Sequence, residues 1–141
     1  MLIGISPLLS PDLLHALASM GHGDEIVLAD ANFPATTLGK RLIHIPGLSA
    51  PTVLQAVLSV MPLDNFVDQP ALTMAIVGDS KTRPATVAEF DVLLQHHKYK
   101  ASAGLERQAF YQRAAQAFAV VATGELRTYG NIILKKGVIA S

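Results

Sequence analysis

Short apolar runs that alternate with segments of helical periodicity constrain the fold of this chain most strongly. EIVLA, RLIHI and LTMAIV are apolar almost throughout, which is typical of strands buried on both faces of a sheet. Two more strand-like runs follow near the end of the chain. The five predicted strands span residues 25–29, 41–45, 72–77, 117–123 and 131–136.

Helical segments separate most of these strands. A proline follows Ser10 directly, and another follows Ser49 after one intervening residue. A serine N-cap with proline in the first turn is a strong helix start. Apolar residues then recur at helical spacing, and Gly21 follows the first helix where a C-terminal glycine is common. We expect helices over residues 11–20, 50–61, 84–98 and 104–116.

This alternation predicts an α/β fold, a three-layer α/β/α single domain over residues 1–141. The last two strands are close enough in sequence to run antiparallel, so we expect a mixed, mostly parallel sheet. The length of 141 residues and a hydrophobic content of 50% suit one domain with a substantial core. No glycine-rich nucleotide-binding or phosphate-binding motif follows the first strand.

Composition narrows the classes of function. Eleven basic residues balance eleven acidic ones, so no long-range field favours nucleic acid or an anionic membrane. The chain has no cysteine, and the adjacent His96 and His97 would diverge on a helix, so we expect no metal site. It shows no signal peptide and no apolar run of roughly 18 residues that could span a bilayer, which predicts a cytoplasmic protein. A charged fraction of only 16% points to surface buried in a homo-oligomer.

A histidine between two glycines, in the segment MGHGDEI, is the first candidate for chemistry. Gly21 and Gly23 would let a ligand approach the His22 ring closely. The preceding helix would direct its negative end at the ring and favour the protonated form, and Asp24 or Asp30 could orient it. The alternative is that His22 caps the helix and points to water, and spacing alone leaves both interpretations open.

Three further positions have two interpretations each. Asp30 ends the first strand, where open α/β sheets bind ligands, but aspartate there also commonly accepts bonds from turn amides. Arg107 would bind a ligand, or it would be solvated or paired with Glu106 or Glu125. The segment 129–131, YGN, is a turn with a packing tyrosine, or a place where glycine lets main-chain amides approach a polar ligand.

The blocks that carry these residues resemble the ribose pyranase / fucose mutarotase family over nearly the whole chain. In order, they are ISPLLSPDLL, MGHGDEI, DANFP, QAFYQRAAQAFAVVATGE and YGNIILKKGV. Gly23, Arg107 and the YGN triplet resemble the fucose branch, since the ribose branch has threonine, histidine and YAN at the matching places. The stretch 64–104 matches least well.

The resemblance implies a cofactor-free isomerase that interconverts the anomers of a monosaccharide, L-fucose or a related deoxyhexose. His22 matches the proton donor of the family. The positions that match its sugar contacts are Asp30, Arg107, Tyr129, Gly130 and Asn131. The family forms decamers of two stacked pentamers, with the pocket near a subunit boundary.

Three alternatives stay open. A ribose-type pyranase would interconvert pyranose and furanose forms, and a non-catalytic sugar-binding accessory of a transport or catabolic operon would only bind. A ring-forming scaffold would leave a pocket of sugar-binding groups unexplained. Proton transfer near neutral pH suits a histidine, which pure binding does not require, so the mutarotase is the preferred prediction.

Overall fold

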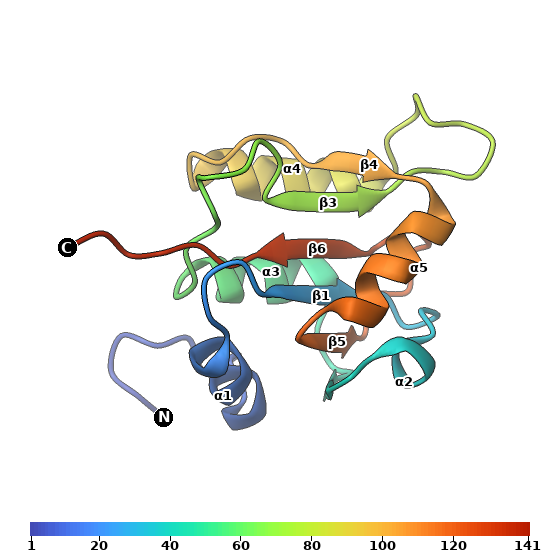
Figure 1. Ribbon diagram of the computed structural model, residues 1–141. Coiled ribbons are helices and arrows are strands. Elements are labelled where there is room, and N and C mark those ends of the chain that lie inside the picture. Colours follow the sequence, from blue (N-terminus) through green and yellow to red (C-terminus); the bar gives the residue numbers. More distant parts are fainter.

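A six-stranded sheet with helices on both faces forms the protein, and the computed structural model describes all residues from 1 to 141 (Figure 1). The strands lie in the order β2-β5-β1-β6-β3-β4. Their bounds are β1 Glu25–Ala29, β2 Leu42–Ile45, β3 Ala71–Met74, β4 Ala103–Leu105, β5 Ala119–Thr123 and β6 Ile132–Lys135. The helices are α1 Pro11–Ser19, α2 Ala35–Leu38, α3 Ala50–Leu58, α4 Ala85–His96 and α5 Arg107–Gln116.

Five strands run in one direction, and β6 runs against them. β2, β5 and β1 pair in parallel, as do β3 and β4, whereas β6 lies antiparallel between β1 and β3. The predicted mixed, mostly parallel sheet is therefore confirmed. The last two strands do run in opposite directions, but they are not neighbours, because β1 lies between them and pairs with both.

Side chains that alternate across the sheet divide the core into two layers. Ile26 and Leu28 of β1 pack on the side that α1, α3 and α4 cover, while Val27 and Ala29 pack on the side of α2 and α5. In Figure 1, α3 and α4 lie behind the strands and α5 lies in front of them. The three-layer α/β/α arrangement is confirmed, and burial on both faces explains why β1 is apolar throughout.

The serine–proline signals begin two helices as predicted. The Ser10 hydroxyl accepts a hydrogen bond from the Leu13 amide at 3.2 Å at the start of α1. The Ser49 hydroxyl does the same for the Thr52 amide at 3.4 Å in α3. Each bond satisfies an amide that has no partner inside its helix.

The predicted helix over 104–116 is wrong in its first turn. Residues 103–105 form β4 instead, and α5 begins at Arg107. The cause is local: the Glu106 carboxylate caps α5 by accepting hydrogen bonds from the amides of Gln108 and Ala109 at 3.0 and 3.1 Å. A carboxylate that satisfies two end amides sets the helix boundary three residues later than the apolar pattern indicated.

The carboxyl ends of the five parallel strands meet at one edge of the sheet, where β6 begins. Asp30 follows β1, Arg107 begins α5 directly after β4, and Asn131 precedes β6. Asp30 and Asn131 are 101 positions apart in sequence, yet they are joined by hydrogen bonds. Open α/β sheets bind their ligands at this edge. None of the helices is long and apolar enough to cross a membrane.

Candidate functional site

A cavity of about 210 Å³ opens at the carboxyl edge of the sheet. Four of the residues that the sequence singled out line it, and they come from the ends of β1, β4 and the turn before β6. The lining residues are Asp30, Asn32, Phe33, Met74, Arg107, Tyr111, Thr128, Tyr129 and Asn131. A larger cavity of about 500 Å³ over α3 has no ionisable side chain in its lining, so the smaller one is the better candidate for chemistry.

Asp30 is the most constrained of these side chains, with only 5% of its surface exposed. Its carboxylate accepts hydrogen bonds from the amides of Asn32 and Gly130 at 3.0 and 3.2 Å and from the Asn131 side chain at 3.0 Å. The Asn131 side-chain carbonyl in turn accepts a bond from the Asp30 amide at 2.8 Å. Burial raises the pKa of Asp30 above its ordinary value, although these hydrogen bonds act in the opposite direction.

The turn before β6 presents Tyr129 to the cavity in an unusual conformation. Its φ angle is 61°, in the left-handed region that residues with a Cβ rarely adopt. The Tyr129 hydroxyl accepts a hydrogen bond from the Val77 amide at 3.1 Å, so its own proton remains available to a ligand. Gly130 does not line the cavity, and its amide donates to Asp30 rather than facing a ligand.

Arg107 is exposed and makes no ion pair, unlike the partnered arginine that was the alternative interpretation. Glu106 is engaged in capping α5, and Glu125 pairs with Arg127. Arg107 lines the cavity, so its donors are free for a ligand there. Guanidinium is a rigid fork of donors that suits neighbouring oxygen atoms.

Two aromatic rings complete the wall, and neither was assigned a role from the sequence. Phe33 and Tyr111 pack edge to face with ring centroids 5.5 Å apart. The only signal for them was their place in the blocks DANFP and QAFYQR, where they could equally be core residues. Sugars present apolar C–H faces as well as hydroxyls, so such rings fit a polar ligand with one apolar face.

His22 does not belong to this cavity. It lies before the amino end of β1, whereas Asp30 follows the carboxyl end, so the length of this five-residue strand, about 16 Å, lies between them. Its 45% exposed side chain contacts Asp64 at 3.0 Å through Nε2, and its ring lies 5.4 Å from the Phe66 ring. No metal-binding group of three or more His, Cys, Asp or Glu side chains occurs here or elsewhere.

The predicted orienting partners of His22 were wrong. The Asp24 carboxylate accepts a hydrogen bond from the Gly21 amide at 2.8 Å, and Asp30 is at the other edge of the sheet. Asp64 takes that place instead. Burial opposes its ionisation, but hydrogen bonds from the Phe66 amide and from His22 lower the pKa of Asp64 below its ordinary value.

Comparison with known proteins identifies the family of the chain. The model of one protein family, described as the RbsD / FucU transport protein family, matches residues 3–139. The chain belongs to this family. Within it, the fucose mutarotase of Bos taurus is 51% identical over 97% of this chain and 94% of its own length.

Two solved structures of the family match the chain to different degrees. The fucose mutarotase of Streptococcus pneumoniae in complex with L-fucose matches with a TM-score of 0.93 and 42% identity, over 99% of this chain and 100% of that chain. The Bacillus subtilis RbsD complexed with D-ribose matches with a TM-score of 0.76 and 26% identity, over 94% and 95%. By both measures the chain is more similar to the first.

Proposed function

We propose that this protein is an isomerase that interconverts the anomers of a free monosaccharide, L-fucose or a related deoxyhexose. One observation carries the proposal: Asp30, Arg107 and Tyr129, from three distant parts of the sequence, meet around a single cavity. The identity with fucose mutarotases over almost the whole chain supports the substrate class. The lower similarity to the ribose-bound relative makes a ribose-type pyranase the second candidate.

The reaction moves protons between oxygen atoms. The anomeric hydroxyl loses its proton, the bond between the anomeric carbon and the ring oxygen breaks, and the ring oxygen gains a proton. After rotation about the bond to the carbonyl carbon, the same steps in reverse close the ring on the other face of the carbonyl. No electrons are transferred to another molecule, so acid and base groups suffice and no cofactor is needed.

The cavity residues divide these tasks by their chemistry. Arg107 would hold neighbouring sugar oxygens with its free donors, and Asp30 would accept a sugar hydroxyl. Asn131 would contribute the second hydrogen of its side-chain amide, since Asp30 takes the first. Tyr129 would be the second proton-transfer group: its hydroxyl oxygen would take the anomeric proton while its own hydroxyl proton passes to water. Gly130 would act through Asp30, to which it donates.

His22 would be the proton donor, with Asp64 holding one ring nitrogen so that the other faces the sugar. Because His22 and the cavity stand at opposite edges of one subunit, His22 of a second copy would complete each cavity. This requires a homo-oligomer, and we propose the ring-shaped decamer of two stacked pentamers with pockets at the subunit boundaries. The charged fraction of 16% is consistent with extensive buried surface.

The test is the exchange rate between anomer signals of L-fucose in saturation-transfer NMR, with and without the protein. We expect faster exchange for L-fucose and a smaller effect on D-ribose. Replacement of His22 by alanine should lower the rate by roughly 10²–10⁴-fold, the usual contribution of a general acid or base. Binding of L-fucose without faster exchange would contradict the proposal and favour a sugar-binding accessory, and faster pyranose–furanose exchange of D-ribose alone would favour the pyranase.

A further inference from the structure

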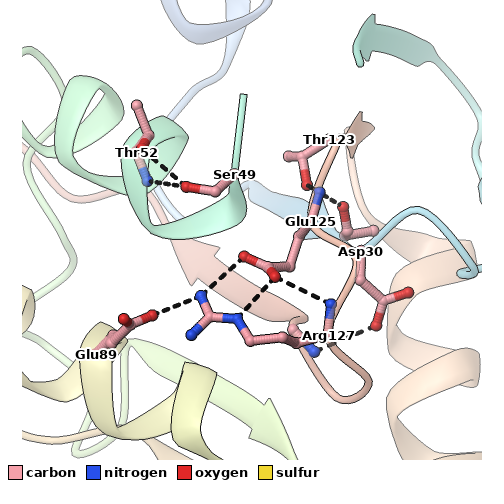
Figure 2. Close-up of polar contacts among 9 residues, drawn as sticks. Asp30, Ser49, Thr52, Glu89, Thr123, Glu125 and Arg127 are labelled. Atoms are coloured by element: carbon pink, nitrogen blue, oxygen red, sulfur yellow. Dashed lines mark hydrogen bonds and ion pairs between the residues drawn. The ribbon is translucent and has the colours of Figure 1, made fainter. Parts of the chain in front are cut away.

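We propose that Glu125 is a positioning residue for the sugar cavity: it does not touch the ligand, but it holds the turn that presents Tyr129 and Asn131. This inference rests on the proposed function, because it concerns the same cavity. Glu125 does not line that cavity. Its side chain lies beneath the turn formed by residues 125–130, and Figure 2 shows the contacts that fix it there.

The Glu125 carboxylate is 4% exposed and is surrounded by donors. It accepts hydrogen bonds from the Arg127 amide at 3.0 Å, from Arg127 Nε at 2.9 Å and from the terminal guanidinium nitrogen at 3.1 Å. The backbone of Ala50, the first residue of α3, is near enough to help lower the pKa of the Glu125 carboxyl. The Glu125 side chain therefore holds residues 125–127 of the turn together, and it lies next to the start of α3.

The backbone of Glu125 connects the same turn to the residues on either side of Asp30. The Ala31 amide donates to the Glu125 carbonyl at 2.8 Å. The Thr123 hydroxyl accepts from the Glu125 amide at 3.2 Å and donates to the Ala29 carbonyl at 2.8 Å. The two neighbours of Asp30 in the chain are thus both linked to Glu125: Ala31 directly, and Ala29 through Thr123. Figure 2 shows the side chains of Asp30, Thr123 and Glu125 together.

Gly130 makes the coupling tight. A Cβ atom at this position would come within 2.7 Å of Glu125 Cγ and within 3.4 Å of Asp30 Cβ. The glycine backbone therefore lies directly on the Glu125 side chain, and in this position its amide reaches the Asp30 carboxylate at 3.2 Å. A shift of the Glu125 side chain would be transmitted to Asp30 through Gly130.

Tyr129 explains why the turn needs such support. A left-handed conformation is unfavourable for a residue with a Cβ, and such strain persists only where the surroundings determine the conformation. Arg127 and Thr128, which lead into the Tyr129–Gly130 corner, lie outside the strands and take part in no strand pairing. The bonds from Arg127 to Glu125 supply the support that a strand pairing would otherwise give.

The charges agree with this role. The Arg127 guanidinium lowers the pKa of Glu125, so the buried carboxylate remains ionised and keeps accepting these bonds. Arg127 also bridges outward to Glu89 of α4 at 2.6 Å, but the Glu89 side chain is 50% exposed. The outer pair is therefore a surface contact of small energetic value, while the inner pair is the buried one.

The test compares Glu125→Gln with Glu89→Gln, which carries the same chemical change at the outer end of the network. Glu125→Gln keeps the side-chain volume but replaces one acceptor oxygen by an NH2 group, which cannot accept hydrogen bonds from the Arg127 donors. We expect the dissociation constant for L-fucose, measured by NMR titration on the folded protein, to rise at least 10-fold for Glu125→Gln and less than twofold for Glu89→Gln. A merely structural role would lower the melting temperature and leave the dissociation constant of the folded protein unchanged.

Arg127→Gln is the second variant, because it keeps Glu125 and the Arg127 main-chain amide while removing the guanidinium. It should weaken L-fucose binding several-fold, and it decides the question if Glu125→Gln does not fold. The inference is overturned if the folded variants bind L-fucose as tightly as the wild-type protein. The proposed function fails separately, if the wild-type protein itself does not accelerate anomer exchange.

Discussion

Two inactive variants of this protein, His22→Ala and Arg107→Ala, are expected to restore activity to one another when their subunits are mixed. The first removes the proposed proton donor and the second removes a sugar contact in the cavity. Loss of charge-assisted hydrogen bonds from Arg107 is worth about 1.5–3 kcal/mol, or roughly 10–150-fold in sugar affinity. Each variant alone should therefore be nearly inactive at low sugar concentration.

The structure sets the magnitude of the recovery. Within one chain, His22 and Asp30 lie at opposite ends of β1, which is about 16 Å long, so in the proposed mechanism a site takes His22 from one subunit and Arg107 from another. In a closed ring built from equal amounts of both variants, a site has an intact His22 half of the time and an intact Arg107 half of the time. About one quarter of the sites should then be complete in such a symmetric assembly.

The assay is anomer exchange of L-fucose by mixed oligomers, formed by co-refolding two differently tagged variants and purified over both tags. A second mixture, wild type with the double variant His22→Ala/Arg107→Ala, is the control. Sites shared between subunits predict about one quarter of wild-type activity in both mixtures. Sites within one subunit predict none in the first and about half in the second, and that pattern would refute the shared site.

Two further predictions concern pH and backbone strain. Burial raises the pKa of Asp30 above 3.8, so ionisation of this group lowers the stability of the fold as pH rises through the raised pKa, and L-fucose affinity should fall as pH falls through it. Titration of the dissociation constant against pH should show this step in the wild type and not in Asp30→Asn. Lys98 has a φ angle of 66°, so Lys98→Gly should stabilise the fold by roughly 0.5–1 kcal/mol and raise the melting temperature by about 2–4 °C, whereas Lys100→Gly, with the same change of charge, should not.

Local signals were sufficient to predict most elements of the fold. Ser10 and Ser49 cap their helices as expected, and the apolar runs form strands because both sheet faces are covered. The strand order could not be predicted in the same way. β6 pairs with β1 and β3 through contacts between residues that are far apart in sequence, such as Ile132 with Leu28, and no local pattern encodes that choice.

The candidate site, too, could be predicted only in part. Asp30 could be placed at the carboxyl end of a strand, where open α/β sheets bind ligands, but its grouping with Arg107, Tyr129 and Asn131 depended on the family resemblance. The separation of His22 from them depends on which end of β1 each residue occupies, and the partner Asp64 lies in the stretch 64–104 that resembled the family least. The sequence indicates Glu125 only as a possible partner for Arg107, because nothing in it shows that Arg127 is nearer.

The hydrogen-bonding capacity of the cavity suggests why the proposed acid is placed elsewhere. Three donors already bond the Asp30 carboxylate, while Arg107 is unpaired and Tyr129 retains its proton, so the cavity has more free donors than acceptors. Such donors stabilise the negative charge that develops on the anomeric oxygen as the ring opens. They would not select which oxygen is protonated. A separate acid on a neighbouring subunit would approach the sugar from one side and would therefore protonate the ring oxygen rather than another oxygen. It would also make the activity of this protein depend on its assembly.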